Sequence, residues 1–248
     1  MTFPTLPTRH ASKGGLFVVV TLLAALLAPR SVMAQGVVVD QGTFAVTLEG
    51  RLAGTEEFTI RRAGLNRDDA LFATGTVTLR RSGGEQQLRT LLRATPVDGL
   101  PKCQGTQPCY QVDVEGPDAM SVLLGLSGRR YVARIVNAAG EEIREFPAAP
   151  DTRILEVDVA HLYYFLKDVQ EGVVSPVLGP RDRMRANLRA GSWTQEQIQL
   201  GPNIVQARRV EFSSGEDRRV VWFDRLGRVL RVSVPAKSYL AERTDLVG

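Results

Sequence analysis

The stretch TFAVTLEGRLAGTEEFTIRR, Thr43–Arg62, decides the fold class. Apolar residues alternate with polar ones in its first part, at Phe44 and Val46, and again in its second part, at Phe58 and Ile60. Alternation with a period of two is typical of a strand that is buried on one face only. The segment GRLAG between the two parts predicts a turn, so we expect a half-buried antiparallel hairpin.

Alternating segments of this kind continue along the chain and are joined by short turn-forming segments. The further strands that this pattern predicts are Thr74–Arg80, Gln86–Ala94, Cys109–Glu115, Arg129–Asn137, Glu141–Phe146, Thr152–Val157, Arg183–Ala190, Ser192–Leu200, Ile204–Phe212 and the two strands of Val220–Pro235. Strands with short connections are antiparallel neighbours. We therefore predict an all-β, mainly antiparallel fold: a single curled sheet that forms a barrel or half-barrel with one short helix. A two-sheet β-sandwich is the alternative.

The last predicted hairpin, VVWFDRLGRVLRVSVP (Val220–Pro235), is apolar on both faces of its first strand. A type I turn at DRLG places Trp222 across from Leu230. Parity then assigns a set of five residues to the main core: Val220, Trp222, Leu230, Val232 and Val234. Phe223 lies on the other face, which is apolar only near the turn, and we expect a helix or a ligand to cover it there.

One segment, DVAHLYYFLKDV from Asp158 to Val169, departs from the period of two. Its apolar residues recur at helical spacing, which predicts a short helix with Asp158 as the N-cap. Tyr164 and Phe165 lie off the main apolar stripe, and the following GVVSPVLGPRD predicts an apolar loop. A helix that is apolar around most of its circumference has to be covered on two sides. It is either ordinary core that plugs one end of the barrel or a lid over a ligand.

The N-terminus has the pattern of a secretory signal peptide. Basic residues precede an apolar run from Leu16 to Ala28, and Val32 and Ala34 provide the small residues that a signal peptidase requires. The run is shorter than the about 20 residues that span a bilayer as a helix. We expect cleavage after Ala34, which leaves residues 35–248 as a single antiparallel β domain that does not span the membrane and is periplasmic or secreted.

Removal of residues 1–34 also changes what the charge implies. The chain has 31 basic and 27 acidic side chains, and the signal segment contains Arg9, Lys13 and Arg30 but no acidic residue. The remaining chain is nearly neutral, and its arginine-rich strands lack the interleaved aromatic residues of a nucleic-acid platform. We therefore expect no nucleic-acid partner.

The only two cysteines, Cys103 and Cys109, lie close together in the segment LPKCQGTQPCY. In an exported protein, a pair of cysteines in a loop with proline and glycine is expected to form a structural disulfide. A redox pair needs closer spacing, and a zinc site needs more ligands than this segment has.

Catalytic and metal motifs are missing from the sequence. Beyond the signal segment there is one histidine, His161, and no GxSxG segment that would provide a nucleophile. The adjacent acidic pairs, such as Glu56 and Glu57, point to opposite faces of a strand and do not converge. We expect a non-catalytic protein with no catalytic residue, cofactor or metal site.

Three segments together resemble a known family. DVAHLYYFL (158–166), RRVVWFDRLGRVLRVSVP (218–235) and TFAVTLEGRLAGTEEFTI (43–60) are similar to segments of an uncharacterised family of exported bacterial proteins, a domain of unknown function. That family is similar in fold to the periplasmic lipoprotein-carrier and lipoprotein-receptor half-barrels, in which a curved sheet holds acyl chains beneath a helical lid. The resemblance implies an envelope protein with a hydrophobic cavity, although the cysteine-closed loop departs from the family pattern.

These features favour a periplasmic protein that binds a hydrophobic or amphiphilic, lipid-like ligand in envelope biogenesis. The loop Gly172–Pro180 and the aromatic helix would form the gate, and the predicted ligand-binding residues are Tyr163, Tyr164, Phe165, Val177, Leu178 and Phe223. The alternative is an envelope scaffold that docks a protein partner and takes no small molecule. An envelope hydrolase ranks below both.

Overall fold

The period-two pattern of the sequence becomes an alternation of burial along the strands. In the first strand, β1 (Val37–Leu48), Phe44 and Val46 are fully buried, whereas Ala45 and Thr47 between and after them are only partly buried. The buried side chains of successive strands face the same side of the sheet and form one continuous core.

The structure is a computed structural model that describes residues 36–64, 69–103 and 107–246. The signal peptide predicted for residues 1–34 lies outside these residues. The other strands are β2 (Arg51–Ala63), β3 (Ala70–Arg81), β4 (Gly84–Ala94), β5 (Tyr110–Glu115), β6 (Met120–Ser127), β7 (Arg130–Asn137), β8 (Gly140–Pro147), β9 (Arg153–Ile154), β10 (Val174–Gly179), β11 (Met184–Ala190), β12 (Thr194–Leu200), β13 (Asn203–Ser214), β14 (Asp217–Phe223), β15 (Val229–Val234) and β16 (Tyr239–Arg243). Two 3-10 helices are η2 (His161–Leu166) and η3 (Pro235–Lys237).

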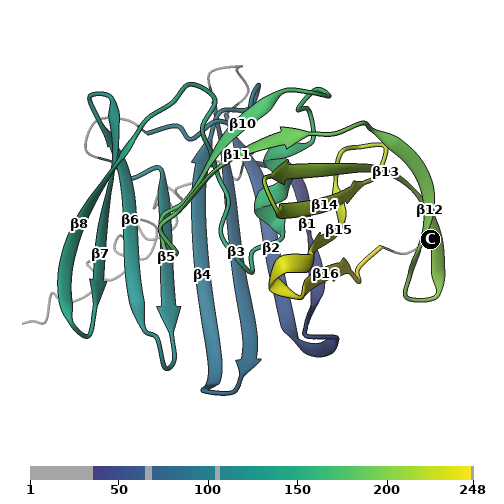
Figure 1. Cartoon of the computed structure of the whole chain (residues 1–248), viewed down its shortest axis with the longest axis horizontal. Coiled ribbons are helices and arrows are strands. Elements are labelled where there is room, and N and C mark those ends of the chain that lie inside the picture. Colours follow the sequence, from purple (N-terminus) through teal and green to yellow (C-terminus); the bar gives the residue numbers. More distant parts are fainter. Residues whose placement is uncertain (1–35, 65–68, 104–106, 247–248) are drawn as a thin grey trace, which may run out of the picture. The chain divides into compact units, whose positions relative to one another are not determined.

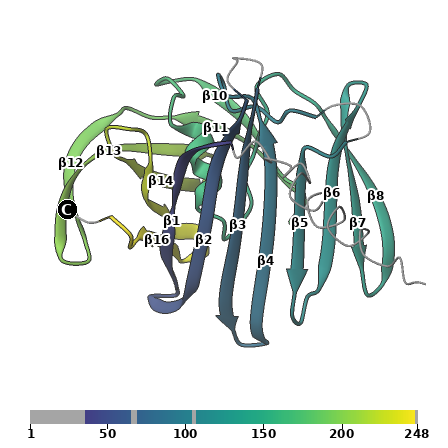
Figure 2. The ribbon, with the colours of Figure 1, turned by 180° about the vertical axis from the view of Figure 1, so that it is seen from behind.

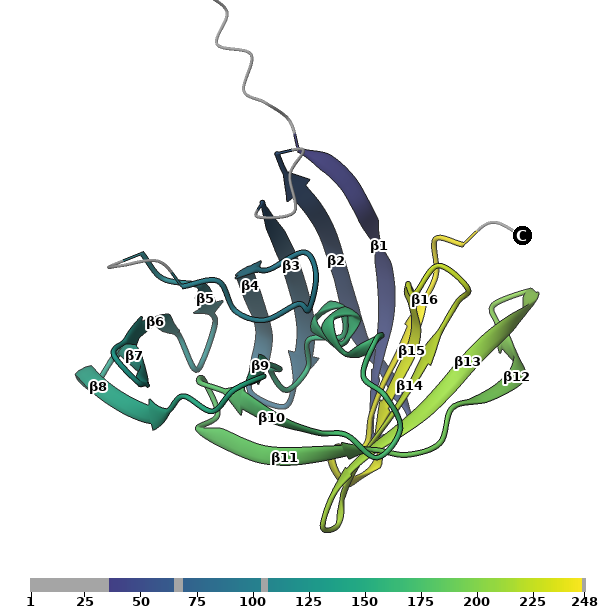
Figure 3. The same ribbon diagram turned by 90° about the horizontal axis from the view of Figure 1, so that it is seen from above.

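All of these strands belong to one sheet, in the order β8-β7-β6-β5-β4-β3-β2-β1-β16-β15-β14-β13-β11-β10-β9, with β12 paired to β13. The strands from β1 to β8 follow one another as neighbours (Figure 1, and from behind in Figure 2). The sheet curls around η2 (Figure 3), and β9 with β10 is the parallel pair in an otherwise antiparallel arrangement of the described strands. Its end strands β8 and β9 do not pair with each other within the described residues, so the curl stays open. The predicted single curled sheet is confirmed.

Three strands depart from what the sequence pattern predicts. β6 and β16 are absent from the prediction. The sequence of β6, MSVLLGLS, does alternate, because Met120, Val122, Leu124 and Leu126 share one face and Leu123 is the one large apolar residue on the other. β10 lies where the apolar loop Gly172–Pro180 was expected, so that loop prediction is wrong. Its Pro176 is compatible with a strand because β10 pairs with β9 only through Val177 and Leu178, which leaves Pro176 without a ladder partner on that side.

The turn of the first hairpin is also tighter than GRLAG suggests, because β2 begins at Arg51. Glu49 and Gly50 make the turn, and both have positive φ angles, 50° and 75°. The expected half-buried antiparallel hairpin itself is present, with Phe44 opposite Glu56.

The helix predicted for Asp158–Val169 is shorter and of a different type. It is the 3-10 helix η2, and all six of its residues are buried. Its core position explains why the aromatic residues Tyr163, Tyr164 and Phe165 occupy consecutive positions: the curled sheet and its loops surround the helix (Figure 3).

The faces of the β14–β15 hairpin depart from the prediction in part. Val232 and Val234 lie in the main core as predicted, whereas Val220, Trp222 and Leu230 do not. A register shift follows Trp222, so that Trp222 pairs with Arg231 instead of Leu230. Phe223 and Val229 therefore belong to the main core, and Trp222 and Leu230 belong to a second, smaller cluster. The buried members of this second cluster are Ile198, Leu200, Ala207 and Leu230, and the β12–β13 hairpin supplies the first three. This strand pair covers the face with Trp222 and Leu230. Phe223 lies in the main core together with the residues of η2, so the expected helix cover of the Phe223 face is present.

Candidate functional site

The start of η2 is held by a carboxylate from the sheet. Glu56 on β2 accepts hydrogen bonds from the backbone N–H groups of Ala160 and His161, at 2.6 and 2.8 Å. The Nδ1 atom of His161 lies 2.6 Å from the same carboxylate. Glu56 and His161 are both fully buried, so an acidic side chain in the core takes the place of an N-cap.

The predicted N-cap, Asp158, has a different role. The N-cap position is Ala160, and no side-chain cap bond is made by it. Asp158 has a φ of 70°, a left-handed conformation that Asp tolerates better than most residues. Its carboxylate pairs with Arg81 at 2.5 Å and lies 3.7 Å from Arg181. The N-cap prediction is wrong because a distant acid, Glu56, already occupies the free N–H groups of this helix end.

Glycine at position 75 allows the close approach of His161 to the sheet. A Cβ atom at Gly75 would lie 2.5 Å from Cε1 of His161, too close for any side chain. Phe58 stacks on the imidazole ring, with centroids 5.7 Å apart and planes 5° apart. The position of η2 against β2 and β3 is therefore fixed by packing as well as by Glu56.

Two adjoining cavities lie beside the segment that leads into η2. One, which we call the tyrosine cavity, has a volume of about 400 Å³. Its walls are Val157, Asp158, Tyr163, Asp182, Met184, Glu216, Asp217, Arg219, Val234, Ala236, Lys237 and Tyr239. The other, which we call the arginine cavity, has a volume of about 470 Å³. Its walls are Leu48, Glu49, Arg81, Gln86, Val114, Asp118, Met120, Val157, Asp158, Arg181, Asp182 and Lys237.

Four residues line both cavities, namely Val157, Asp158, Asp182 and Lys237. We refer to the two cavities together as the mouth. The tyrosine cavity has mostly apolar walls, while the arginine cavity has mostly charged ones. The mouth therefore has the two kinds of surface that an amphiphilic molecule requires.

Arg219 is the main buried charge of the tyrosine cavity. Its guanidinium lies 2.8 Å from the Asp217 carboxylate and donates a hydrogen bond of 3.3 Å to the hydroxyl of Tyr163. Burial raises the pKa of the Tyr163 phenol, so this group is a neutral hydroxyl at physiological pH.

Behind the arginine cavity, Glu156 is almost completely buried. It accepts a hydrogen bond of 3.0 Å from the backbone N–H of Arg181 and lies 3.4 Å from Nε of the same residue. Burial raises the pKa of Glu156 to about 7, because desolvation outweighs the nearby positive charge of Arg181. Burial also raises the pKa of Asp158, against the lowering effect of Arg81 and Arg181.

Tyr239 lines the tyrosine cavity and has a buried hydroxyl without a hydrogen-bond partner in the described part of the chain. Burial raises its pKa well above the ordinary value, and the negative charge of Glu56 adds to this effect. A buried hydroxyl normally has a partner, so the Tyr239 hydroxyl leaves hydrogen-bonding capacity unused beside the tyrosine cavity.

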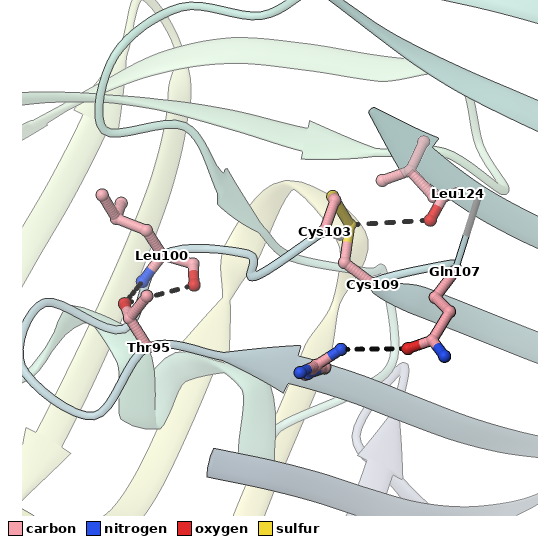
Figure 4. The surroundings of a disulfide bond; sticks show 7 residues. Thr95, Leu100, Cys103, Gln107, Cys109 and Leu124 are labelled. Carbon is pink, nitrogen blue, oxygen red and sulfur yellow. Dashed lines mark hydrogen bonds between the residues drawn. A yellow bond between two sulfur atoms is a disulfide. The ribbon is translucent and has the colours of Figure 1, made fainter. Parts of the chain in front are cut away.

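The other end of η2 is covered instead of open. The loop between β4 and β5 lies against Tyr164 and Phe165, and a Cβ atom at Gly99 would lie 2.9 Å from the Phe165 ring. The backbone of this loop is tied by hydrogen bonds between Thr95 and Leu100, and by the Cys103–Cys109 disulfide with an S–S distance of 2.01 Å (Figure 4). The predicted disulfide is therefore present. The space left beneath this loop is about 20 Å³.

The structure separates the six residues that the sequence predicts as ligand-binding. Tyr163 lines the tyrosine cavity, whereas Tyr164 and Phe165 pack beneath the covering loop. Val177 and Leu178 line a third cavity of about 280 Å³, next to the end of β8. Phe223 is buried against Trp193, with ring centroids 5.7 Å apart.

Several residues of the site do not figure in the sequence prediction, above all Glu56, Arg219 and Tyr239. Glu56 is in phase with the buried Phe58 and Ile60, which is a signal for an inward-facing acid. Nothing local marks Arg219 or Tyr239, because each lies in an arginine-rich or mixed segment and meets its partners only through the fold.

Within the described residues no group of three or more histidine, cysteine or acidic side chains is placed to hold a metal ion. The described helices include none with the length and apolar character needed to cross a membrane.

No family model matches the sequence. A search of curated proteins gives no match either. Among solved structures, the chain is similar to the crystal structure of a beta-barrel-like protein of the domain of unknown function DUF1849 from Brucella abortus. The TM-score is 0.47 and the sequence identity 9%, over 82% of this chain and 94% of that chain.

Proposed function

We propose that this protein is a non-catalytic binding protein of the bacterial periplasm, and that it holds a lipid-like, amphiphilic molecule in the mouth. The tyrosine cavity is the observation that carries the proposal. Its volume of about 400 Å³ lies in the range of small-molecule sites, and such sites combine apolar walls with a few placed polar groups. Val157, Val234 and Met184 provide the apolar walls, and Arg219 provides a fixed polar group.

The mouth, not the space around η2, is the proposed place for the ligand. η2 fills the interior of the curled sheet with six buried residues. An apolar chain in the tyrosine cavity would lie beside Tyr163 at the entrance to this interior. We therefore propose a short apolar segment on the ligand rather than several long acyl chains.

Export supports the proposed location. The signal peptide that the sequence predicts would deliver residues 35–248 to the periplasm, where a soluble domain with such a cavity can accept molecules of the envelope. The predicted absence of catalytic residues is part of the proposal, and the fully buried position of His161 agrees with a structural role for that residue.

A neutral amphiphile tests the proposal. Dodecyl maltoside, titrated into the mature protein below its micelle-forming concentration, is expected to bind saturably in a calorimeter. Ala236→Trp adds a large side chain at an exposed position that lines the tyrosine cavity, and it should reduce the affinity at least about ten-fold by filling the space.

Leu226→Trp is the matched control, because Leu226 is 75% exposed at the tip of the β14–β15 turn and lines neither cavity of the mouth. It should bind like the wild type. Absence of saturable binding to the wild type, or equal affinity in the Ala236→Trp variant, contradicts the proposal.

A further inference from the structure

We infer that the amphiphile of the mouth has a cationic headgroup, specifically a primary ammonium. This inference rests on the proposed function and specifies the class of ligand. It starts from the charges that line the two cavities. The acidic residues are Glu49, Asp118, Asp158, Asp182, Glu216 and Asp217, and the basic ones are Arg81, Arg181, Arg219 and Lys237.

Three of the basic groups are already neutralised by carboxylates. Arg219 pairs with Asp217, and Arg81 pairs with Asp158. Arg181 interacts with Glu156 and with Asp182, at 3.4 and 3.1 Å. An arginine that is held in this way offers little attraction to an anionic headgroup.

The acidic groups are not all neutralised. Glu49, Asp118 and Glu216 are exposed at the mouth and form no salt bridge with any residue that the structure describes. Against these carboxylates stands Lys237, which likewise forms no salt bridge there, although its charge is felt by Asp158. The unpaired charges of the mouth are therefore mainly negative and favour a positive ligand.

Tyrosine side chains give a second, independent indication. The aromatic rings of Tyr163 and Tyr239 line the tyrosine cavity, and the electron-rich face of such a ring attracts cations. The Tyr239 hydroxyl is buried and has no partner in the described chain. A primary ammonium can donate an N–H to the free lone pairs of this hydroxyl, whereas a trimethylammonium group cannot.

A series of amphiphiles with similar chains and different headgroups tests the inference. Dodecylammonium, dodecyl maltoside and laurate are titrated into the mature protein by calorimetry, at low and at high salt. We expect dodecylammonium to bind about ten-fold more tightly than laurate at low salt, and we expect added salt to reduce this ratio.

Substitutions at the mouth test which residues produce the preference for a cationic headgroup. Glu216→Gln with Asp118→Asn should weaken dodecylammonium binding about five-fold at low salt and leave the maltoside unchanged, because only charge is removed. Glu57→Gln with Glu145→Gln is the control pair: these acids lie on the outer face of the sheet, away from the mouth, and should have no effect. Tyr239→Phe should weaken dodecylammonium but not dodecyltrimethylammonium, which has no N–H group to donate.

The outcomes of these titrations distinguish failure of the cationic headgroup from failure of the proposed binding function. If laurate binds as tightly as dodecylammonium while the maltoside binds as proposed, the cationic headgroup is wrong and the proposed function stands. If none of the probes binds, the proposed function fails and the headgroup inference fails with it.

Discussion

The two ends of η2 differ in what lies next to them. At its C-terminal end, Tyr164 and Phe165 pack under a loop that a disulfide holds, and about 20 Å³ of space remains. Before its N-terminal end, the segment with Asp158 adjoins two cavities of about 400 and 470 Å³. The C-terminal end of η2 therefore lies in a closed region, and its N-terminal end lies next to the open, charged mouth.

This difference bears on the choice between plug and lid that the sequence leaves open. The closed C-terminal end of η2 contributes to the stability of the fold, and the open mouth at its N-terminal end can contribute to ligand binding. We therefore expect substitutions at the C-terminal end to change the free energy of unfolding, and substitutions at the mouth to change ligand affinity with little effect on unfolding.

The largest effect on stability is expected for Phe165→Ala. Phe165 is buried against Tyr164 and Gly99, and removing a buried aromatic ring costs about 4 kcal/mol through lost burial and an unfilled cavity. Urea unfolding measures this loss. Leu226→Ala, at an exposed turn, should change stability by less than about 0.5 kcal/mol. A Phe165→Ala variant as stable as the wild type would mean that this end of η2 is not closed core.

Glu56→Ala should be nearly as destabilising at the other end of η2. It removes the acceptor for two backbone N–H groups and for the His161 ring, inside the core, which we expect to cost about 3 kcal/mol. The neighbouring Glu57 is exposed on the opposite face, so Glu57→Ala provides a matched control with little effect. Equal unfolding midpoints for the two variants would contradict the capping role of Glu56.

Glu156, buried behind the arginine cavity, should make the stability of the protein depend on pH. Its pKa is raised from 4.5 to about 7 in the folded protein, so the folded state binds this proton more tightly than the unfolded chain does. The resulting stability is present at low pH and is lost as the pH rises from about 4.5 to about 7.

Glu156→Gln cannot ionise and lacks this loss. Relative to the wild type, the variant should therefore gain about 3 kcal/mol of stability between pH 4.5 and 8, measured by urea unfolding at several pH values. A difference between the two proteins that stays constant with pH would show that Glu156 ionises normally in the folded state.

The smallest of these stability effects is expected from the disulfide. It closes a short loop with a sequence separation of 6, for which loop-closure entropy gives about 2 kcal/mol. The double variant Cys103→Ala with Cys109→Ala should lose this amount and keep its affinity for dodecyl maltoside. A loss of affinity without a loss of stability would place the loop in the binding site instead of the closed end.

Most strands of the sheet can be predicted from the sequence, because the alternation of apolar and polar residues is a local property of each strand. The strands around Phe44, Phe58 and Leu88 follow it closely, and the single curled sheet follows from their short connections. It fails where a segment with proline and glycine forms a strand instead of the expected loop, as in β10, and where a register shift after Trp222 changes the face of Leu230.

The candidate site is much harder to predict from the sequence, because the residues that contact one another there are far apart along the chain. Asp158 has the sequence features of an N-cap, yet Glu56 holds the helix from 105 residues away from His161. Arg219 and Tyr163 meet across 56 residues. The histidine could be recognised as a packed residue, but its partner and the cavities beside it depend on the curl of the sheet.

The methionines provide the most direct test of the difference between the two ends of η2. Of the chain's 4 methionines, Met120 and Met184 lie in the described residues, and each lines one cavity of the mouth. Val97→Met adds a third methyl group at the closed end, at a position that is 72% exposed. The measurement is a ¹³C-methyl NMR titration of this variant with dodecyl maltoside below its micelle-forming concentration. We predict a saturable shift of the Met184 signal and no shift at position 97. A shift at position 97 with Met184 and Met120 unmoved would contradict the account.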